Sequence, residues 1–365
     1  MKFTINREKL LEPLHLACGV VERKQTAPIL SNILLCAEGG SLVITSSDEE
    51  VELTVTIAEV SIEDEGEVTV PARKLMDICR SLPDNADMTA CLDGNRVAID
   101  SGRFSSYLAT LPSAEFPSIE VGSPDVAIPL PVADLRKLLQ RTSFAMAQQD
   151  VRYFFNGVLL EVEDETVRFV ATNGQRLATS HVKLEESLGS HQFIIPRKAV
   201  GELSRILDGE DTVSLNFTSS HMLLERPGLK LITKLIDATY PDYTRAIPTA
   251  GNKMVVADRQ LLKEALSRTA ILSNELYRNV RLIVMRDKLD MHANNPQQEE
   301  AEESIAVEYD GETLEIGFNV SYLIEALSVM QGEKVRITLM DATSACVLED
   351  VNDTESLYVI SPMVL

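Results

Sequence analysis

The residues best suited to acid–base or metal chemistry are scattered along the chain. None of the histidines lies in an HExxH sequence, the arrangement that holds catalytic zinc in many metalloproteases. The chain also lacks GxSxG, which presents a nucleophilic serine, and GxxxxGK[ST], which binds nucleotide phosphates. These patterns favour a protein that is not an enzyme and needs neither a metal nor a cofactor. The histidines are His15, His181, His191, His221 and His292.

The acidic cluster of Asp48, Glu49 and Glu50 comes nearest to a paired-carboxylate site. Asp48, however, shares its position in an internal repeat with Asn173 and Asn295. Asp and Asn at one position between strands are typical of turns, where their side chains bond to the backbone. We therefore interpret the cluster as a solvated turn, which is not expected to act as a general acid.

The cysteines are odd in number and form no CxxC pair. Buried free thiols of this kind are typical of a reducing compartment. The N-terminal sequence MKFTINREKLL carries charges where a secretion signal would be apolar, and no apolar run is long enough to span a membrane. We therefore expect a cytoplasmic protein with no membrane partner. The cysteines are Cys18, Cys36, Cys79, Cys91 and Cys346.

Basic residues are concentrated on predicted helices, although the chain carries a formal charge of −22. Arg80 and Arg205 even occupy the same repeat position. A basic helical face with acidic charge elsewhere would bind a phosphate backbone there and repel it from the rest of the surface. Alternatively, these cations simply lie on the solvent-facing sides of helices. With no base-reading motif present, any DNA contact would be independent of base sequence.

One hydrophobic pattern occurs three times, and the copies are domain-sized. Each copy predicts a short strand, an amphipathic helix, a pair of strands, a second helix and closing strands. Asn6, Asp134 and Asp258 are the expected caps of the first helices. The pattern is Phe3, Ile5, Leu10 and Leu14, then Ile128, Leu130, Leu135 and Leu139, then Val255, Ala257, Leu262 and Leu266. Between them, Leu42 and Ile44 correspond to Val167 and Phe169 and to Leu289 and Met291.

Two helices and many strands in each copy predict an α+β fold of three repeated domains, each with two helices packed on antiparallel sheets. The expected domains are 1–125, 126–251 and 252–365. Proline-containing segments at 111–120 and 240–248 are expected to link them. The expected helices span about 6–18, 70–82, 132–146, 195–207, 258–272 and 318–330.

Four segments closely resemble the bacterial DNA polymerase III beta subunit, the replicative sliding clamp, and the similarity covers the whole chain. The segments are VPARKLMDICRSLPD, ATNGQRLA, YPDYTRAIP and ANNPQQEEAEE. The resemblance implies a non-catalytic head-to-tail dimeric ring of clamp-type domains that encircles double-stranded DNA. It also implies that the ring tethers the DNA polymerase III alpha subunit, other polymerases and repair proteins, and is opened by a clamp loader.

The resemblance also assigns residues to DNA contact and to a pocket for client peptides. The family commonly has His where this chain has Gln175 and Met where it has Ser361. Without the family, Asn173–Gly174 reads only as a hairpin turn. The implied DNA-binding residues are Lys24, Arg73, Arg80, Gln149, Arg197 and Lys198. The implied pocket residues are Phe155, Thr172, Gly174, Gln175, Arg176, Leu177, Pro241, Arg245, Ala246, Thr343, Val359, Ser361, Pro362 and Met363.

A third implied set joins two chains through a basic and an acidic patch, which suits a head-to-tail contact, and through apolar residues beside them. The family often has an aromatic residue at the position of Ser106, whereas Phe104 and Tyr107 stand nearby. Read alone, the acidic run could be a solvated strand edge that prevents aggregation. The implied interface residues are Lys74, Arg96, Arg103, Leu108, Ile271, Leu272, Glu299, Glu300, Glu302 and Glu303.

The alternative to a ring is a peptide-binding adaptor built from the same repeats that never encircles DNA. A ring remains on closed circular DNA and leaves after linearisation, whereas the adaptor would not distinguish the two forms. The sequence therefore predicts a DNA sliding clamp, with the adaptor as the competing hypothesis.

Overall fold

The structure is a computed structural model that describes residues 1–22 and 27–364. It consists of two compact units, Met1–Val132 with Gly201–Leu235 and Ala133–Val200 with Ile236–Leu365. Each unit contains strands from two successive repeats. This division therefore does not test the three domain boundaries expected from the sequence, which stay a prediction.

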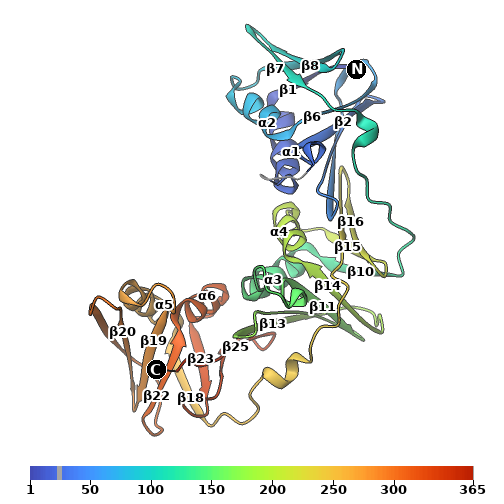
Figure 1. The fold of residues 1–365 in the computed structure, drawn as a ribbon. Coiled ribbons are helices and arrows are strands. Elements are labelled where there is room, and N and C mark those ends of the chain that lie inside the picture. Colours follow the sequence, from blue (N-terminus) through green and yellow to red (C-terminus); the bar gives the residue numbers. More distant parts are fainter. Residues whose placement is uncertain (23–26, 365) are drawn as a thin grey trace. The chain divides into compact units, whose positions relative to one another are not determined.

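The described chain contains two α-helices in each repeat (Figure 1). Asn6 caps the first helix, where its side chain accepts a hydrogen bond from the backbone N–H of Glu8 at 3.1 Å. Asp258 likewise caps α5 through the N–H of Leu261 at 2.7 Å. The expected cap at Asp134 is wrong, because the helix begins two residues earlier and Asp134 lies in its first turn. The helices are α1 (Arg7–Val20), α2 (Ala72–Ser81), α3 (Val132–Thr142), α4 (Arg197–Ile206), α5 (Arg259–Thr269) and α6 (Val320–Val329).

The strands follow the order expected from the repeat, with one additional short strand, β5, in the first copy. The first copy contains β1 (Lys2–Asn6), β2 (Asn32–Glu38), β3 (Ser41–Ser47), β4 (Val51–Ile57), β5 (Ser61–Asp64), β6 (Gly66–Pro71), β7 (Asp87–Asp93), β8 (Arg96–Ser101) and β9 (Phe104–Ala109). The second contains β10 (Val126–Pro131), β11 (Gly157–Glu163), β12 (Thr166–Thr172), β13 (Arg176–Lys183), β14 (Ser190–Pro196), β15 (Thr212–Phe217), β16 (His221–Arg226) and β17 (Leu229–Lys234). The third contains β18 (Lys253–Asp258), β19 (Asn279–Met285), β20 (Lys288–Asn294), β21 (Glu300–Ala306), β22 (Leu314–Asn319), β23 (Lys334–Leu339), β24 (Cys346–Asp350) and β25 (Ser356–Ile360).

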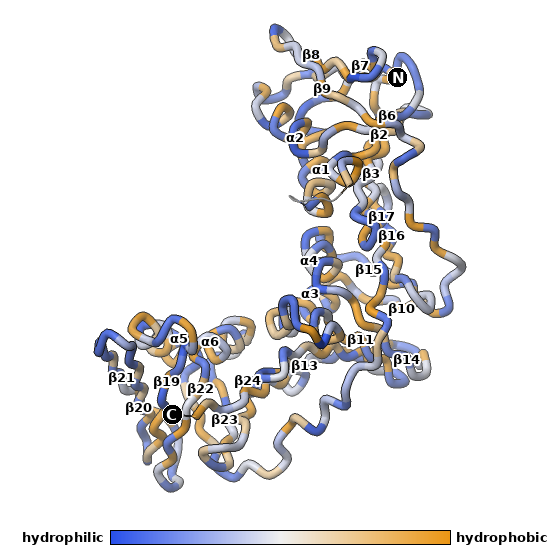
Figure 2. Tube along the Cα trace, in the orientation of Figure 1, coloured by the Kyte–Doolittle hydropathy of each residue, from blue (hydrophilic) through white to orange (hydrophobic). Residues whose placement is uncertain are grey.

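Aliphatic side chains form most of the cores, in a chain without tryptophan, and Phe3, Phe169, Phe217 and Phe318 are buried among them. In the first unit, Leu10 and Leu14 of α1 and Leu75 of α2 are buried against Ile33 and Leu35 of β2. Hydrophilic and hydrophobic residues alternate along many strands (Figure 2), which matches sheets with one buried face. The α+β fold with helices packed on antiparallel sheets is therefore confirmed.

The turn position shared by the three repeats serves one structural purpose. Asp48 Oδ1 accepts hydrogen bonds from the backbone N–H groups of Glu50 and Val51 at 3.0 and 2.7 Å. Asn173 and Asn295 accept backbone hydrogen bonds in their own turns in the same way. Because these side chains are occupied in holding turns, the interpretation of the acidic cluster as a turn is confirmed.

Each eight-stranded sheet is assembled from two repeats. In the first unit the order is β10-β15-β16-β17-β4-β3-β2-β6, so the last strand of the second repeat pairs with β4. In the second unit the order is β14-β11-β12-β13-β25-β24-β23-β18, so the last strand of the third repeat pairs with β13. One rule, called here the junction rule, thus describes both junctions: the last strand of a repeat, its closing strand, pairs with the fourth strand of the preceding repeat.

In the two smaller sheets, the strands that would take part in such a junction lie at an edge. The five-stranded sheet has the order β5-β1-β7-β8-β9 and ends at the closing strand of the first repeat. The four-stranded sheet has the order β21-β20-β19-β22 and ends at the fourth strand of the third repeat. Among the described strands, β9 is therefore a closing strand without a partner in this chain, and β21 is a fourth strand without one. The junction rule would pair a β9 with a β21.

Candidate functional site

A hollow of about 160 Å³ in the second unit brings together most of the residues implied for the client pocket. The β12–β13 turn, strand β25 and the linker before β18 supply its walls. Phe155, Leu177 and Val359 form an apolar floor together with Tyr240, whose ring meets that of Phe155 at a centroid distance of 6.0 Å. The predicted residues that line it are Phe155, Thr172, Gly174, Gln175, Arg176, Leu177, Pro241, Ala246, Val359 and Ser361.

Four implied pocket residues do not line this hollow. Arg245 is exposed and pairs with Asp242 at 2.9 Å. The hydroxyl and backbone N–H of Thr343 bond to Asp341 in a separate turn. Met363 donates its backbone N–H to Gly317 of β22 at 2.8 Å, which anchors the C-terminal segment, and Pro362 precedes it. These residues could contact only a peptide that extends beyond the hollow.

The β12–β13 turn requires glycine at its tip. Gly174 has φ of 88°, a left-handed conformation that favours glycine. A Cβ atom there would also lie 3.0 Å from the guanidinium of Arg152. Thr172 closes the turn by donating its hydroxyl to the carbonyl of Arg176 at 2.6 Å. The hairpin reading of Asn173–Gly174 is therefore confirmed, and this hairpin is also a wall of the pocket.

Helix α6 supports the same turn. The hydroxyl of Tyr322 donates to Gln175 Oε1 at 3.0 Å and accepts from Asn173 Nδ2 at 3.1 Å. The guanidinium of Arg176 lies 4.4 Å from the centre of the Tyr322 ring and forms an ion pair with Glu325. Gln175 is therefore held against α6 by an uncharged hydrogen bond.

Tyr240, Asp242 and Tyr243 also line the hollow, although the sequence did not predict them there. Tyr243 donates its hydroxyl to Glu161 Oε2 at 2.6 Å, and Arg168 donates to the same oxygen at 3.1 Å. Glu161 is buried, and burial raises the pKa of Tyr243 to about 12, so the phenol remains a donor. The two tyrosines beside Pro241 in YPDYTRAIP were the available signal.

We expect Tyr243→Phe to loosen the linker wall of the pocket. The buried carboxylate of Glu161 would lose one donor, which costs about 1–3 kcal/mol of stability. Affinity for a short fluorescent peptide with two hydrophobic anchors should fall several-fold in fluorescence anisotropy. Tyr309→Phe is the matched control, because it removes a hydroxyl that bonds to the Glu312 carbonyl outside the pocket. Equal affinity loss in both variants would contradict a specific role for the linker anchor.

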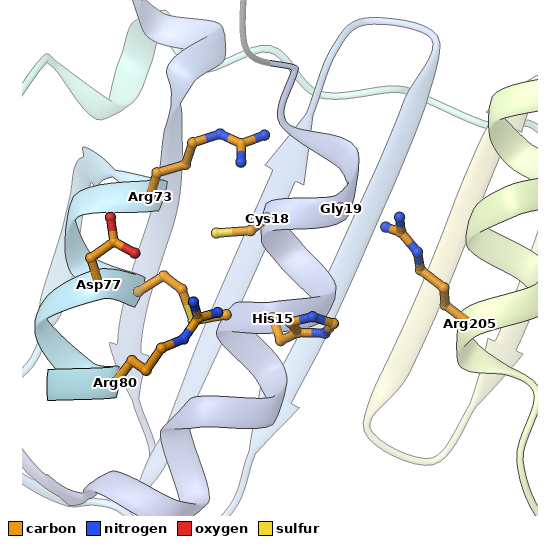
Figure 3. Close-up of a pocket in the computed structure, with 8 residues that line it drawn as sticks. His15, Cys18, Gly19, Arg73, Asp77, Arg80 and Arg205 are labelled. Atoms are coloured by element: carbon orange, nitrogen blue, oxygen red, sulfur yellow. The ribbon is translucent and has the colours of Figure 1, made fainter. Parts of the chain in front are cut away.

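A second hollow, of about 690 Å³, lies in the first unit, and its lining includes three arginines and one acidic residue, Asp77. Arg73 and Arg80 of α2 and Arg205 of α4 project into it beside His15 of α1 (Figure 3). Arg73 also donates to the carbonyl of Val21 at 2.8 Å, which holds its guanidinium near the end of α1. The structure therefore brings together three cations from two helices that are separate in sequence.

Arg205 was not among the predicted DNA contacts, although it shares the repeat position of Arg80. Its guanidinium pairs with buried Glu202 at 3.1 Å, which offsets part of its charge. Gly19 permits this approach, because a Cβ atom there would meet both Arg205 and Glu202 at less than 3.0 Å. The repeat position was therefore the signal that could have identified this residue.

The other predicted DNA contacts are only partly described. Lys24 lies outside the described residues. Arg197 is exposed and donates to the carbonyls of Met146 and Ala147 at 3.3 Å, which brings it to the loop that carries exposed Gln149. Lys198 is half-buried on the same helix as Arg197.

The residues implied for joining two chains lie in the first repeat, on α2, β8, β9 and the turn between these strands, and in the third repeat, on η6, β21 and the turn before it. Lys74, Arg96 and Arg103 are exposed in the first repeat. The guanidinium of Arg96 lies 4.0 Å from the centre of the exposed ring of Tyr107 on β9. Basic and aromatic groups thus occur together at the β9 edge.

The third repeat presents acidic and apolar groups. Along β21, Glu300 and Glu302 are exposed, while Glu303 pairs with Arg268 of α5 at 2.5 Å; Glu299, just before the strand, is exposed. The 3₁₀ turn η6 (Ala270–Leu272) carries Ile271, which is 75% exposed, and half-buried Leu272.

Leu108, another implied interface residue, is largely buried within its own chain. Leu108 is only 6% exposed and belongs to the core of the first unit, because it points inward from β9. It therefore offers little surface to a partner. Phe104 and Tyr107, whose orientation the sequence left open, are both exposed on β9.

Metal-ligating side chains do not gather in the described part of the chain. No group of three His, Cys, Asp or Glu residues among the described residues lies close enough together to hold a metal ion. No helix within residues 1–22 and 27–364 is long and apolar enough to cross a membrane.

Comparison with known proteins assigns the whole chain to one family. Models of the DNA polymerase III beta subunit match residues 1–120 as its N-terminal domain, 129–242 as its central domain and 244–364 as its C-terminal domain. The Beta sliding clamp of Pseudomonas putida is 49% identical over 365 residues, and that of Escherichia coli is 44% identical over 364 residues. Both comparisons cover 100% of each chain.

Solved structures agree with this assignment. The crystal structure of the DNA polymerase III subunit beta from Pseudomonas aeruginosa matches with a TM-score of 0.94 at 47% identity and covers 100% of both chains. The beta sliding clamp of Caulobacter crescentus matches with a TM-score of 0.94 at 34% identity. The resemblance inferred from the sequence is confirmed: this chain belongs to the DNA polymerase III beta subunit family, the bacterial beta sliding clamps.

Proposed function

We propose that this chain is a DNA sliding clamp: two copies close head to tail into a ring that encircles duplex DNA without sequence preference. The observation that carries the proposal is the pair of free edges left by the junction rule. Strand β9 of one chain is the closing strand that lacks a partner, and β21 of another chain is the fourth strand that lacks one. Such a contact joins two different surfaces, and in this proposal two copies are enough to close the ring.

The internal junctions also predict the register of that contact. Ile44, Phe169 and Met291 share a repeat position, and their neighbours on the fourth strand are Val55, Ser180 and Glu303. At the two existing junctions, Val55 pairs with Leu229 and Ser180 with Ser356, each the first residue of a closing strand. The first residue of β9 is Phe104. We therefore expect Phe104 opposite Glu303 of the partner subunit.

Charge supports the same pairing. The β9 edge carries Arg96 and Arg103, whereas β21 and the turn before it carry exposed glutamates. Attraction between the two edges would favour this contact over like-with-like association.

The basic hollow formed by Arg73, Arg80 and Arg205 is the surface that would face the DNA backbone. Phosphate contacts supply affinity but carry no base information, so the ring could slide. The pocket beside Tyr243 would bind peptides of the DNA polymerase III alpha subunit, other polymerases, repair proteins and the clamp loader. Tethering raises the local concentration of a polymerase at its template without any catalysis by the clamp. In this proposal the domains are 1–125, 126–251 and 252–365, and the protein acts in the cytoplasm.

Sedimentation and a topology experiment test the proposal. The protein should sediment as a dimer. After loading on nicked circular plasmid it should co-elute with DNA in gel filtration, and cutting the plasmid once should release it. Equal retention on circular and linear DNA would favour the adaptor, and a protein that stays monomeric at micromolar concentration would overturn the ring.

A further inference from the structure

The junction between the second and third repeats is closed by ion pairs as well as by strands. On α3, Lys137 forms an ion pair with Glu355, the residue just before β25. One turn further along, Arg141 pairs with Asp353 at 2.5 Å and donates to the Ser356 hydroxyl at 2.9 Å. Helix α3 is therefore basic at this junction, and the turn between β24 and β25, which contains Asp353 and Glu355, is acidic.

The repeat shows which residues would take these places between two chains. Leu135 and Leu139 of α3 correspond to Leu262 and Leu266 of α5, so Lys137 corresponds to Glu264. The residue just before β9, which corresponds to Glu355, is Arg103. At the contact between chains the two charges are therefore exchanged: the helix residue, Glu264, is acidic and the residue before the closing strand, Arg103, is basic.

The remaining junction carries no such pair. The position of Lys137 corresponds to Glu12 on α1, and the residue just before β17 is Gly228. The three junctions therefore differ in these two residues. The helix residue is a cation between the second and third repeats and an anion at the contact between chains. Between the first and second repeats the helix residue is Glu12, but Gly228 offers it no opposite charge.

In the single chain, the Glu264 carboxylate accepts a hydrogen bond from the uncharged Gln260 side chain at 2.7 Å, which leaves its negative charge in place for a cationic partner. Its side chain is 52% exposed, and its nearest cation is Arg268 at 3.9 Å. The same guanidinium lies only 2.5 Å from Glu303 on β21. Two carboxylates thus share one arginine, so the α5–β21 surface keeps a negative charge that a further guanidinium could neutralise.

We propose that Arg103 of the partner subunit docks on Glu264, beside Glu303, and that this inverted ion pair selects the head-to-tail contact between chains. The inference rests on the proposed ring, whose strand register places Phe104 opposite Glu303 in the middle of β21 and so brings the turn before β9 next to Glu303. Through Glu264, it makes α5 part of the interface.

The exchanged charges act mainly by disfavouring incorrect pairings between repeats. If the hairpin of a third repeat approached β21 of another chain, Glu355 would meet Glu264. If the hairpin of a first repeat approached a vacant β13, Arg103 would meet Lys137. Like charges in these positions disfavour both wrong junctions, whereas the correct pair adds attraction between partly exposed groups.

A charge-swap cycle measured by analytical ultracentrifugation tests the inference. Glu264→Lys and Arg103→Glu should each raise the dimer dissociation constant about tenfold. The double variant, which restores opposite charges with their positions exchanged, should return to within about threefold of the unmodified chain. Glu312→Lys is the control, since it makes the same charge change at an exposed residue of the third repeat outside α5 and β21. Thermal melting should show that every variant remains folded.

The outcomes separate the inference from the proposed function. If Arg103→Glu weakens the dimer but Glu264→Lys does not, the pairing of Arg103 with Glu264 is contradicted, while the proposed ring is not. The pairing is equally contradicted if both single variants weaken the dimer and the double variant is weaker still. An unmodified chain that forms no dimer would instead remove the ring itself.

Discussion

Replacing Ile271 by Asp is expected to convert the dimer largely to monomer at micromolar concentration. Ile271 is 75% exposed on η6, so its replacement should leave the fold of the free chain nearly unchanged. In the ring it would be covered by the partner, and the variant would bury a carboxylate without a partner. A penalty of about 3 kcal/mol corresponds to roughly a hundredfold or more in the dimer dissociation constant. Sedimentation velocity over a concentration series measures the change.

Met254→Asp is the matched control for this experiment. Met254 is also an exposed apolar residue of the third repeat, but it lies on β18, an edge strand of the eight-stranded sheet, and not on η6 or β21. Its variant should dimerise like the unmodified chain. If both variants dimerise normally, the surface around Ile271 does not join two chains, and the proposed closure loses its apolar component.

The second large effect is expected from neutralising the basic hollow. Changing Arg73, Arg80 and Arg205 together to Gln removes the cations that line it. The dependence of log binding constant on log salt concentration should become shallower by about one for each phosphate contact that is lost. Affinity for duplex DNA at moderate salt should fall at least about tenfold, while the dimer remains intact. Fluorescence anisotropy over a salt series measures both quantities.

A triple variant with the same change in net charge controls for the overall field of the protein. Lys183, Lys230 and Arg286 lie on strands or in a turn between strands, away from the helices. Changing them to Gln should leave the salt dependence nearly unaltered. Equal effects from the two triple variants would mean that total charge, and not the helical face, governs binding to DNA.

Local patterns predicted the order of elements because helix and strand periodicity are properties of neighbouring residues. Spacing of Leu10 and Leu14 identifies the buried stripe of α1, and Asn6 and Asp258 are correctly identified as caps. The same reasoning failed for Asp134, because the helix already begins at Val132 and Asp134 lies inside its first turn. It could not settle whether Leu108 or Phe104 is available to a partner, since that depends on which face of β9 meets the core.

The pocket was predicted in part for a similar reason. The residues of the β12–β13 turn are contiguous, so the motif ATNGQRLA brings them together by itself. Tyr243 became part of the pocket only because Glu161, far away in sequence, is buried beneath the linker and accepts its hydroxyl. Likewise, Arg205 joins Arg73 and Arg80 only because Gly19 allows α1 and α4 to approach closely.

The sequence by itself therefore determined the threefold repeat, the kinds of element within each copy, the segregation of basic charge onto helices and the family. Those features depend on residue types and their spacing along the chain. Tertiary structure alone decided which strands remain without a partner. Strand pairing joins segments far apart in sequence, so β9 and β21 can be recognised as free edges only after β17 has paired with β4 and β25 with β13.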